Sequence, residues 1–561
     1  MSALIECVPN FSAGRDLGVV RQITARIESV EGATLLHVDP GNATNRTVVT
    51  FAGEPGPVVE AAFRAIAAAA ELIDMRQHTG AHPRMGATDV CPLVPISGIG
   101  MEETAEHARH LAERVGRELG IPVYLYEAAQ SNPAKKNLAT IRAGEYEGLA
   151  RKMADPAWKP DFGPGEFNPK SGATVIGARD FLVAFNANLN TTSTRRANAV
   201  AFDVRESGRP RREGDPLTGK VVKDAAGRPA MIPGTLKAVK AIGWFIEEYG
   251  LAQVSMNLTD IKVTPLHVAF DAVCRAAEER GLRVTGSELV GLIPLSAMLD
   301  AGRYFLRKQQ RSTGVSDAAL IRIAVASMGL EDIGSFVPEE RIIEYRLRKP
   351  GASRLAELSL REFIEETASE SVAPGGGSVA AAVGALGAAL GTMVANLSAH
   401  KRGWDARWEE FSRWAEQGQR IKEDLLRLVD DDTRAFGRVM DALGMPRETD
   451  RDKSARAEAL EAANIGALEV PWNVMRAAWE AFPLLRAMAD QGNPASASDA
   501  GVGALCTRAA IRGAWLNVRT NAGGIKNKAA IAKILDEGER LEKAAATQEA
   551  EILAIVEKKF S

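Results

Sequence analysis

Residues 336–357, FVPEERIIEYRLRKPGASRLAE, separate two parts of the chain that follow different patterns. Before this stretch, apolar runs typical of strands alternate with amphipathic helical runs, which indicates an α/β fold. After it, Ala, Leu, Glu, Lys and Arg dominate with helical periodicity and without a convincing strand. The stretch itself is charged and interrupted by proline, which is typical of a linker, with a docking helix around residues 339–346.

The chain has 561 residues, enough for three or four hydrophobic cores, so we expect a multidomain protein. A Gly- and Pro-rich passage at residues 158–180, WKPDFGPGEFNPKSGATVIGARD, divides the first part. We therefore predict two α/β subdomains with mixed sheets, residues 1–180 and 181–330, and a ligand cleft between them. Residues 331–357 form the predicted linker, and residues 358–561 form a predicted all-α bundle of long helices.

The composition of the chain argues against nucleic acid and membranes as partners. With 46% hydrophobic and 25% charged residues and a net charge of −3, the chain lacks the basic excess that nucleic-acid binding needs. No signal peptide is expected, and four cysteines without CxxC spacing fit reduced thiols in the cytoplasm. The longest apolar run, at residues 379–399, approaches the length of a membrane span. Its Ala and Gly content favours close helix packing, so no membrane partner is expected.

Two of the seven histidines, His78 and His82, lie in the segment HTGAHPRMGATDVCP. A spacing of four suits two zinc ligands on one helical face, but Gly80 and Pro83 interrupt a helix here and no third ligand is signalled. No metal is therefore expected. The residues alone leave two readings open: structural loop histidines, or an acid/base group beside Arg84 in a site for a substrate with carboxylates.

Two motifs of the helical part carry candidate chemistry. SVAPGGGS, residues 371–378, precedes the longest apolar run, and a helix N-terminus there suits a carboxylate or a phosphate. A flexible capping linker is the alternative, because the motif lacks the GK[ST] of a P-loop and follows no strand. LVDDDTRAF, residues 428–436, places three aspartates in a helix, where one or two can face inward and acquire a raised pKa. A solvated acidic face is the alternative.

Several segments of the first part resemble the glutamate formiminotransferase family in the same order. They are ECVPNFSAGRD, DPGNATNRTVVTFAG, HTGAHPRMGATDVCPLVPISG, IRAGEYEGL, PDFGP, GATVIGARDFLVAFNANL and GSELVGLIPLSAMLDA. The resemblance implies two α/β subdomains and transfer of a formimino group from N-formimino-L-glutamate to tetrahydrofolate, in histidine breakdown. One imidazole near neutral pKa can take a proton from the attacking nitrogen and give one to the leaving nitrogen.

The resemblance also implies roles for individual residues. The acid/base histidine of the family falls on His82, and His78 is then expected to be a positioning neighbour. The folate-binding stretch of the family falls on Gly163, Pro164, Gly165, Glu166, Phe167, Asn168, Pro169, Lys170, Ser171 and Gly172. Further substrate contacts are expected from one loop of the first subdomain and one strand of the second, at Asp39, Asn42, Asn45, Arg46, Asn186, Asn188 and Asn190, with strand-end polarity as the alternative.

The helical part resembles the formiminotetrahydrofolate cyclodeaminase family in the ordered motifs APGGGSVAAA, LVDDDTRAF, GNPASASDAGVGA and GAWLNVRTNA. The resemblance implies closure of 5-formiminotetrahydrofolate to 5,10-methenyltetrahydrofolate with loss of ammonia. The essential aspartate of the family falls on Asp432, the expected proton-transfer group. The residues expected to line the pocket or orient the pterin are Gly376, Gly377, Ser378, Asn493, Asp499 and Asn517, and Lys401 is a candidate for binding carboxylate.

Both resemblances on one chain imply a bifunctional folate enzyme. The product of the first reaction is the substrate of the second, which suggests transfer of a polyglutamylated folate between the sites. The family further implies a homo-oligomer, an octameric ring. Two alternatives stay open: one half has lost its activity, or the chain is a folate-binding or filament-binding scaffold without turnover.

Overall fold

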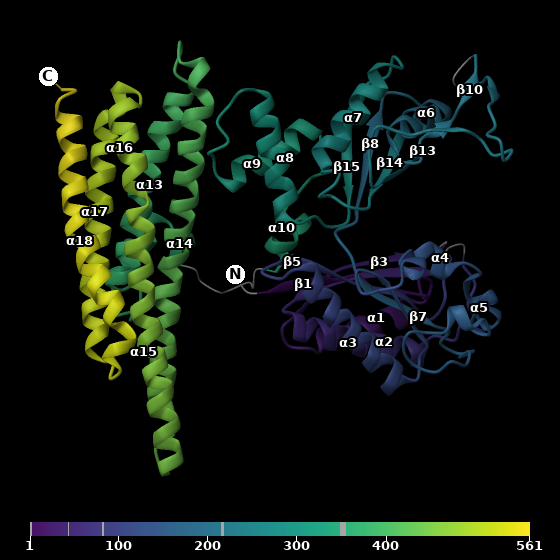
Figure 1. Ribbon diagram of the computed structural model, residues 1–561, viewed down its shortest axis with the longest axis horizontal. Helices are drawn as coiled ribbons and strands as arrows, with labels where there is room; N and C mark the ends of the chain where they lie inside the picture. Colours follow the sequence, from purple (N-terminus) through teal and green to yellow (C-terminus); the bar gives the residue numbers. More distant parts are fainter. Residues whose placement is uncertain (1–2, 43, 81–82, 215–217, 348–354, 561) are drawn as a thin grey trace. The chain divides into compact units, whose positions relative to one another are not determined.

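A computed structural model of the chain describes residues 3–42, 44–80, 83–214, 218–347 and 355–560. The chain folds as two compact units, one formed by Met1–Ala301 and Val325–Lys349 and the other by Gly302–Ala324 and Pro350–Ser561. In Figure 1 the sheets belong to the first unit, and the second unit is built of helices. The predicted fold class, mixed α/β subdomains followed by a helical bundle, is therefore confirmed.

The boundary between the units differs from the predicted linker at residues 331–357. The segment Val325–Lys349 belongs to the first unit, and it contains the short helices α10 (Pro338–Arg341) and α11 (Ile343–Arg346) where a docking helix is predicted. Ile342 and Ile343 are fully buried, which fixes this segment in place. Charged residues dominate residues 336–357, so the sequence pattern does not single out these two buried isoleucines.

The segment Gly302–Ala324 belongs to the helical unit, although it falls within the predicted second α/β subdomain. The backbone N–H of Thr313 donates to Ser412 Oγ at 3.1 Å, in α14 (Trp408–Gly444). The helices α8 (Leu295–Lys308) and α9 (Asp317–Met328) contain the points where the chain passes between the two units.

The first sheet is built around the two short strands β1 (Leu4–Cys7) and β2 (Asn10–Phe11). They follow one another between β4 (Arg46–Gly53) and β5 (Thr88–Ser97), antiparallel to both. The sheet continues with β3 (Ala33–Gly41) beside β4, and with the parallel strands β7 (Thr174–Ala178) and β6 (Val123–Glu127) beyond β5.

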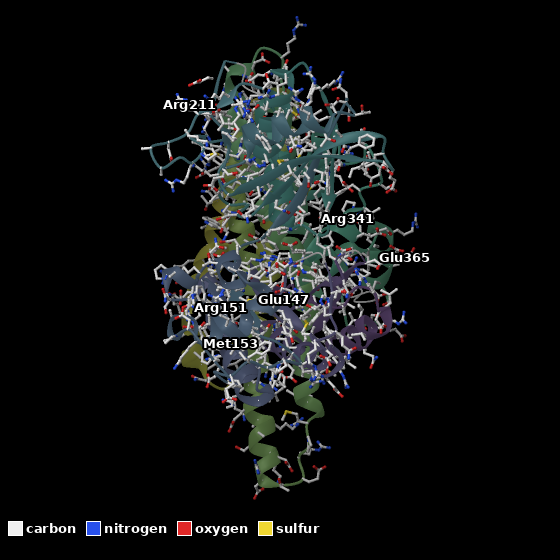
Figure 2. All side chains as sticks on the ribbon, turned by 90° about the vertical axis from the view of Figure 1, so that its right-hand side faces the viewer. Glu147, Arg151, Met153, Arg211, Arg341 and Glu365 are labelled. Atoms are coloured by element: carbon white, nitrogen blue, oxygen red, sulfur yellow. The ribbon has the colours of Figure 1, made fainter. Side chains whose placement is uncertain are left out.

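The two faces of this sheet differ because strand side chains alternate. One face is covered by α1 (Leu17–Glu28), α2 (Pro55–Leu72) and α3 (Met101–Leu119), which lie together below the sheet in Figure 1. Ile5 and Cys7 point into that core, with no exposed surface. The opposite face is partly covered by α4 (Leu138–Arg142), α5 (Glu145–Met153) and α11, and Figure 2 marks Glu147, Arg151 and Met153 of α5.

The second sheet is antiparallel, in the order β13 (Val239–Ile246), β14 (Leu251–Leu258), β8 (Val183–Leu189) and β15 (Val284–Val290). The helices α6 (Thr194–Val204) and α7 (Leu266–Glu278) pack against one face of it. Short strand pairs follow α6: β9 (Arg209–Pro210) with β12 (Met231–Ile232), and β10 (Arg212–Glu213) with β11 (Lys220–Val221).

The helical unit is a bundle around α13 (Gly376–Ala399), which packs against α14 and α17. The other helices are α12 (Leu360–Thr367), α15 (Asp450–Trp479), α16 (Ala481–Gln491), α17 (Ala497–Gly523) and α18 (Lys528–Glu557). Helical periodicity runs through residues 452–489, but this stretch forms two helices, α15 and α16. Pro483 explains the break, because in a continuous helix its ring would clash with the carbonyl of Trp479.

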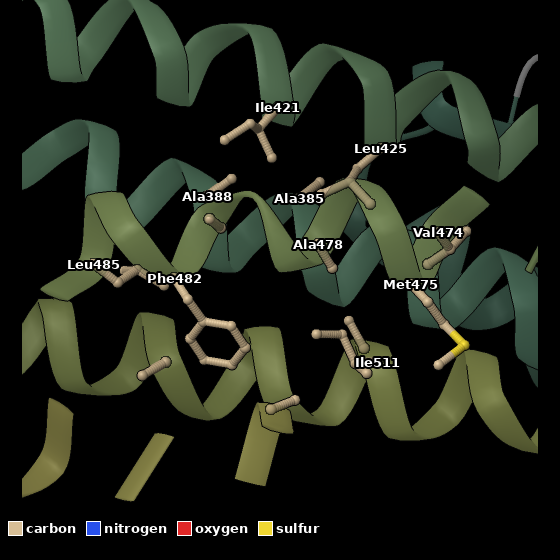
Figure 3. Close-up of a cluster of buried hydrophobic side chains, with 14 of the residues drawn as sticks. Ala385, Ala388, Ile421, Leu425, Val474, Met475, Ala478, Phe482, Leu485 and Ile511 are labelled. Carbon is tan, nitrogen blue, oxygen red and sulfur yellow. The ribbon is translucent and has the colours of Figure 1, made fainter. Parts of the chain in front are cut away.

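Close packing of α13 depends on small residues. Figure 3 shows Ala385 and Ala388 of α13 in the same buried cluster as Ile421 and Leu425 of α14. A Cβ at Gly387 would lie 2.6 Å from Thr507 Oγ1 of α17, closer than atoms normally approach. Among the described helices, α13 alone is long and apolar enough to cross a membrane, and 61% of its most apolar window is buried within the protein.

Candidate functional site

The loop of the two predicted histidines begins at His78 and ends at Arg84. His82, the predicted acid/base residue, lies outside the described residues. Arg84 Nε donates to His78 Nδ1 at 3.2 Å, and His78 Nε2 lies 2.8 Å from the backbone carbonyl oxygen of Asn45. Because a carbonyl oxygen only accepts, Nε2 carries the ring proton and Nδ1 is the acceptor. His78 is therefore held as the neutral imidazole.

Electrostatics favour the same form of His78. Burial is the main cause that lowers its pKa, and the positive charge of Arg84 lowers it further, against the hydrogen bond to Asn45. Both ring nitrogens are engaged with the protein. This geometry suits a residue that positions the loop, and it leaves no nitrogen of His78 free to exchange a proton with a substrate.

Arg84 fastens the loop to α5. Its guanidinium donates to both carboxylate oxygens of Glu147, at 2.6 and 2.9 Å, and to Glu145 at 3.2 Å. The hydrogen bond to Glu147 is the main cause that raises the pKa of Arg84. A cavity of about 530 Å³ lies beside the loop, lined by Thr79, Gly80, Arg84, Gly144, Glu145 and Glu147.

Asn45, a predicted substrate contact, forms hydrogen bonds with other parts of the protein. Its Oδ1 accepts from the backbone N–H groups of Gly14 and Arg15, at 3.1 and 3.2 Å, and its Nδ2 donates to the Thr79 carbonyl at 3.0 Å. Its backbone is left-handed, with φ of 49°. Asn45 therefore connects the histidine loop to the start of β4, a structural role that polar composition alone does not reveal.

A cleft of about 550 Å³ lies on the face of the first sheet that is turned away from α1–α3, and both α/β subdomains line it. Two residues predicted from the sequence, Asp39 and Arg46, belong to its wall. Sequence reasoning missed the other polar residues of the wall, which are Glu6, Asn10, His37, Thr50, Tyr126, Arg142, Arg179 and Asn257. The signal was present in ECVPN, where Glu6 and Asn10 alternate with apolar residues and so share one face.

The charges of the cleft fall into two groups. Arg142 pairs with the fully buried Asp89 at 2.6 Å, and burial lowers the pKa of nearby Arg46 to about 10. On the adjacent strand, burial raises the pKa of Glu6 to about 7, which the positive charge of Arg179 partly opposes. An adjoining cavity of about 500 Å³ shares Arg142 and Arg179 with the cleft. The two cavities are together large enough for ligands of drug-like size.

Asn186 and Asn188, also predicted as substrate contacts, do not line this cleft. Their amides bond within the protein, on the second sheet: Asn186 Nδ2 donates to Glu288 at 3.0 Å, and Asn188 Nδ2 donates to Asp332 at 2.9 Å. Gln253 also donates to Asn188 Oδ1, at 2.8 Å. These asparagines are buried because the protein satisfies their amides internally.

The predicted folate-binding stretch, residues 163–172, does not line the cleft either. It packs beside α5 and the histidine loop. The Tyr146 hydroxyl donates to the Pro169 carbonyl at 2.6 Å, and the backbone N–H of Met75 donates to the Lys170 carbonyl at 2.8 Å. Phe167 is partly buried against the core under α4 and α5, and Ser171 is buried as well.

In the helical unit, Asp432 of α14 lies against the N-terminus of α13. Its Oδ2 accepts from the backbone N–H of Ser378 at 2.8 Å and lies 2.9 Å from Ser378 Oγ. Burial is the main cause that raises the pKa of this carboxyl, and the two Ser378 donors act in the opposite direction. Of the three aspartates in the motif, Asp432 is thus the one held at the predicted glycine-rich loop.

Ser378 can serve both protonation states of Asp432. Its hydroxyl lies 2.9 Å from Asp432 Oδ2 and 3.1 Å from the Val429 carbonyl, and it has one proton to donate. When Asp432 is ionised, the hydroxyl donates to the carboxylate. When Asp432 is protonated, the hydroxyl can accept from the carboxyl group and donate to Val429. This exchange suits a carboxyl group that transfers protons.

Gly376 and Gly377 allow the N-terminus of α13 to lie close to Asn517 and Asp432. A Cβ at Gly377 would lie 2.7 Å from the carboxyl carbon of Asp432, and a Cβ at Gly376 would lie 3.2 Å from Asn517 Nδ2. The structure therefore brings together five residues predicted from separate motifs, which are Gly376, Gly377, Ser378, Asp432 and Asn517.

Asn493 and Asp499 do not join this group. The backbone N–H of Asn493 donates to Ser398 Oγ at 2.8 Å, near the C-terminal end of α13. Ser398 lies twenty positions after Ser378 in the same helix, a separation of roughly 30 Å at 1.5 Å per residue. Lys401, just beyond this helix end, lies over the Trp404 ring at 4.2 Å. Within one chain, these predicted residues belong to the opposite end of α13.

No group of three or more His, Cys, Asp and Glu side chains able to hold a metal ion occurs among the described residues.

The chain was compared with known families and proteins. It matches the formiminotransferase domain, N-terminal subdomain, over residues 4–179, the formiminotransferase domain over residues 184–348, and formiminotransferase-cyclodeaminase over residues 359–540.

Three relatives illustrate the coverage. The formimidoyltransferase-cyclodeaminase of Sus scrofa is 41% identical over 99% of this chain and 98% of its own length. The formimidoyltransferase-cyclodeaminase of Gallus gallus is 40% identical over the whole of both chains. The glutamate formimidoyltransferase of Streptococcus pyogenes is 39% identical over 55% of this chain and 94% of its own length.

Proposed function

The chain belongs to the formiminotransferase-cyclodeaminase family, and from this premise we propose how its residues carry out the two reactions. It is a bifunctional folate enzyme. The first reaction moves the formimino group of N-formimino-L-glutamate to tetrahydrofolate, and the second closes 5-formiminotetrahydrofolate to 5,10-methenyltetrahydrofolate with release of ammonia.

In the proposed transfer step, N5 of tetrahydrofolate attacks the amidine carbon and loses a proton. The bond from this carbon to the glutamate nitrogen then breaks, and that nitrogen gains a proton. His82 is the proposed group that takes the first proton and gives the second. The neutral, doubly hydrogen-bonded His78 supports this role by holding one end of the loop, while Arg84 holds the other end on α5.

In the proposed cyclisation step, N10 attacks the formimino carbon of 5-formiminotetrahydrofolate and loses its proton. The exocyclic nitrogen gains protons and leaves as ammonia, and the carbon becomes the methenyl bridge. Asp432 is the proposed donor to the leaving nitrogen, because burial raises the pKa of its carboxyl and Ser378 accommodates both of its protonation states. This contact between Asp432 and Ser378 is the single observation that carries the assignment.

The function is tested by mixing the protein with tetrahydrofolate and formiminoglutamate and following ammonia and the methenyl absorbance. Both products are expected. Asp432→Asn should stop the sequence at 5-formiminotetrahydrofolate, with cyclisation reduced about 10²- to 10⁴-fold and transfer unchanged. A wild-type protein that forms 5-formiminotetrahydrofolate without ammonia would have one active half, and a protein that forms neither product would be a scaffold.

We also propose that the folate carries a polyglutamate tail that stays bound while its one-carbon end moves between the sites. The fusion of successive activities on one chain supports this proposal. The intermediate should then reach the second site faster than by release into solution. A lag in methenyl formation as long as that of the two separated domains would contradict the transfer.

We propose a homo-oligomer, an octameric ring, in which each unit contacts its counterpart in another chain. Support comes from large apolar side chains left exposed on both units. On the second sheet these are Ile242, Trp244 and Phe245, and in the bundle they are Leu386, Met393, Leu397, Val502 and Leu505. Two different twofold contacts per chain can close a ring of dimers. None of the four cysteines, all of which lie in the described part of the chain, forms a disulfide, which suits the proposed cytoplasmic location.

A further inference from the structure

Glu6 is a buried carboxyl group that the two proposed reactions leave without a role. It lies on β1, opposite Ala52 of β4 and Val94 of β5, in the interior of the first sheet. Its neighbours Ile5 and Cys7 point into the helix-covered core, so Glu6 points to the other face and lines the cleft. It is 5% exposed.

The carboxyl group of Glu6 makes no hydrogen bond within the described part of the chain. Its charged neighbours are Arg179 and Glu344. Glu344 already accepts from the backbone N–H of Leu295 at 2.7 Å, and Arg179 donates to the Asp180 carbonyl at 2.9 Å. A buried carboxylate without hydrogen-bond donors is costly, so such a group in a cleft wall indicates a ligand that donates to it.

Two cations of the cleft are also without a carboxylate partner among the described residues. Arg142 is paired with Asp89, whereas Arg46 and Arg179 have no ion pair there. Among the charged residues around Glu6, Arg179 has the largest electrostatic effect on its carboxyl group. Arg46 instead donates to Asn10, four residues along from Glu6, which is roughly 13 Å in an extended strand.

Besides Asp39 and the ion pair of Arg142 with Asp89, the cleft thus offers one carboxylate, Glu6, with a cation beside it and a second cation farther along. N-formimino-L-glutamate has the complementary arrangement. Its amidine carries N–H groups on two nitrogens joined through one carbon, its α-carboxylate lies next to that amidine, and its side-chain carboxylate lies farther away. A planar pair of N–H donors meets a carboxylate in two parallel hydrogen bonds, as an arginine does.

We propose that Glu6 binds the amidine of N-formimino-L-glutamate, with Arg179 on its α-carboxylate and Arg46 on its side-chain carboxylate. The proposal rests on the transferase activity proposed above and names the substrate-recognising residue of that site. Glutamate, the product, keeps only one of the two amidine nitrogens, as its ammonium group, and therefore loses the paired hydrogen bonds to Glu6. Glu6 therefore distinguishes the donor substrate from the product that must leave.

The test compares Glu6→Gln, Glu6→Asp and the wild type, with Glu28→Gln as the matched control. Glu28 is an exposed glutamate of α1, on the sheet face away from the cleft. For Glu6→Gln, KM for formiminoglutamate should rise about tenfold to a hundredfold, because hydrogen bonds to a charged group are lost, while KM for tetrahydrofolate stays unchanged. Glu6→Asp should recover part of the loss, and Glu28→Gln should match the wild type.

Calorimetric binding of formiminoglutamate and of glutamate gives a readout independent of turnover. Glu6→Gln should weaken the binding of formiminoglutamate more than that of glutamate. An unchanged KM for tetrahydrofolate in the transfer reaction shows that the first unit of the variant is folded. A rise in KM for tetrahydrofolate alone would overturn the proposal and assign Glu6 to the amino-substituted edge of the pterin. If the wild type catalyses transfer and Glu6→Gln binds formiminoglutamate as tightly as the wild type, the proposal is overturned. If the wild type catalyses no transfer, the proposed function is contradicted instead.

Discussion

At the scale of single residues, the environment decides which of several similar groups can move protons. His78 has both ring nitrogens engaged, by Arg84 and by the Asn45 carbonyl. Asp432 has one carboxylate oxygen, Oδ2, held by two donors of Ser378, and its other oxygen accepts no hydrogen bond from the described residues. The proposed proton transfer at Asp432 therefore depends on a serine that the aspartate run of the motif does not contain.

Removal of that hydroxyl gives a pH test. The Ser378 donors lower the pKa of Asp432, against the larger effect of burial, so Ser378→Ala should raise this pKa further. If Asp432 donates a proton, cyclisation slows as pH rises through its pKa. The alkaline limb of the cyclisation profile should therefore move to higher pH in the variant. A limb that stays in place or moves to lower pH would contradict the role of Asp432 as the donor.

The sequence predicted some site residues and missed others for physical reasons. The grouping of Asp432 with Ser378 and Asn517 follows the motifs, because each motif lies on a helix face that packs toward α13. Asn493 shows the limit of the same reasoning, since residues of one motif set can lie at opposite ends of a long helix. Glu6 and Arg179 were missed because the face to which a strand side chain points depends on which side the helices cover.

At the scale of elements, the N-terminus of α13 lies close to Asp432, the proposed proton donor. Gly377 permits this contact, because any Cβ there would lie 2.7 Å from the carboxyl carbon of Asp432. The elements themselves were largely predictable from periodicity. The exceptions were the break before Pro483 and the buried Ile342 and Ile343, where single residues outweigh the average pattern of their segment.

Gly377→Ala tests this contact. The added methyl group should displace the Asp432 carboxyl and reduce cyclisation by about a hundredfold, as a misplacement of about 1 Å does, with transfer unchanged. Gly437→Ala is the control in α14, where a Cβ meets nothing within 4 Å. It should keep both activities and raise the free energy of unfolding by about 0.5–1 kcal/mol, measured by denaturant titration. Full cyclisation in Gly377→Ala would show that the close contact has no catalytic role.

At the scale of the whole molecule, each of the two units presents exposed apolar side chains, Ile242 in the first and Leu386 in the second. A ring needs both contacts. Ile242→Lys and Leu386→Lys should therefore each reduce the proposed octamer to smaller assemblies, because a charge in a self-association surface is desolvated without a partner. Light scattering gives the mass in solution. An octamer that survives both substitutions, or a monomeric wild type, would contradict the ring.

In the proposed function, each of the two units supplies one reaction. Sequence motifs predicted the two activities, and the family assignment supports both. The assignment of each reaction to a unit rests on two proposed proton-transfer residues, His82 in the first unit and Asp432 in the second. Substitution of His82 should leave the second unit active, and substitution of Asp432 should leave the first unit active, because each residue lies within its own unit.

The most direct measurement is ammonia release from formiminoglutamate and tetrahydrofolate by His82→Ala, by Asp432→Ala and by an equal mixture of the two. Each variant alone should release almost none, since one cannot make the intermediate and the other cannot close it. The mixture should release ammonia, as 5-formiminotetrahydrofolate made by one variant is closed by the other. A silent mixture of folded variants, or full release by either variant alone, would contradict two separate proton-transfer sites.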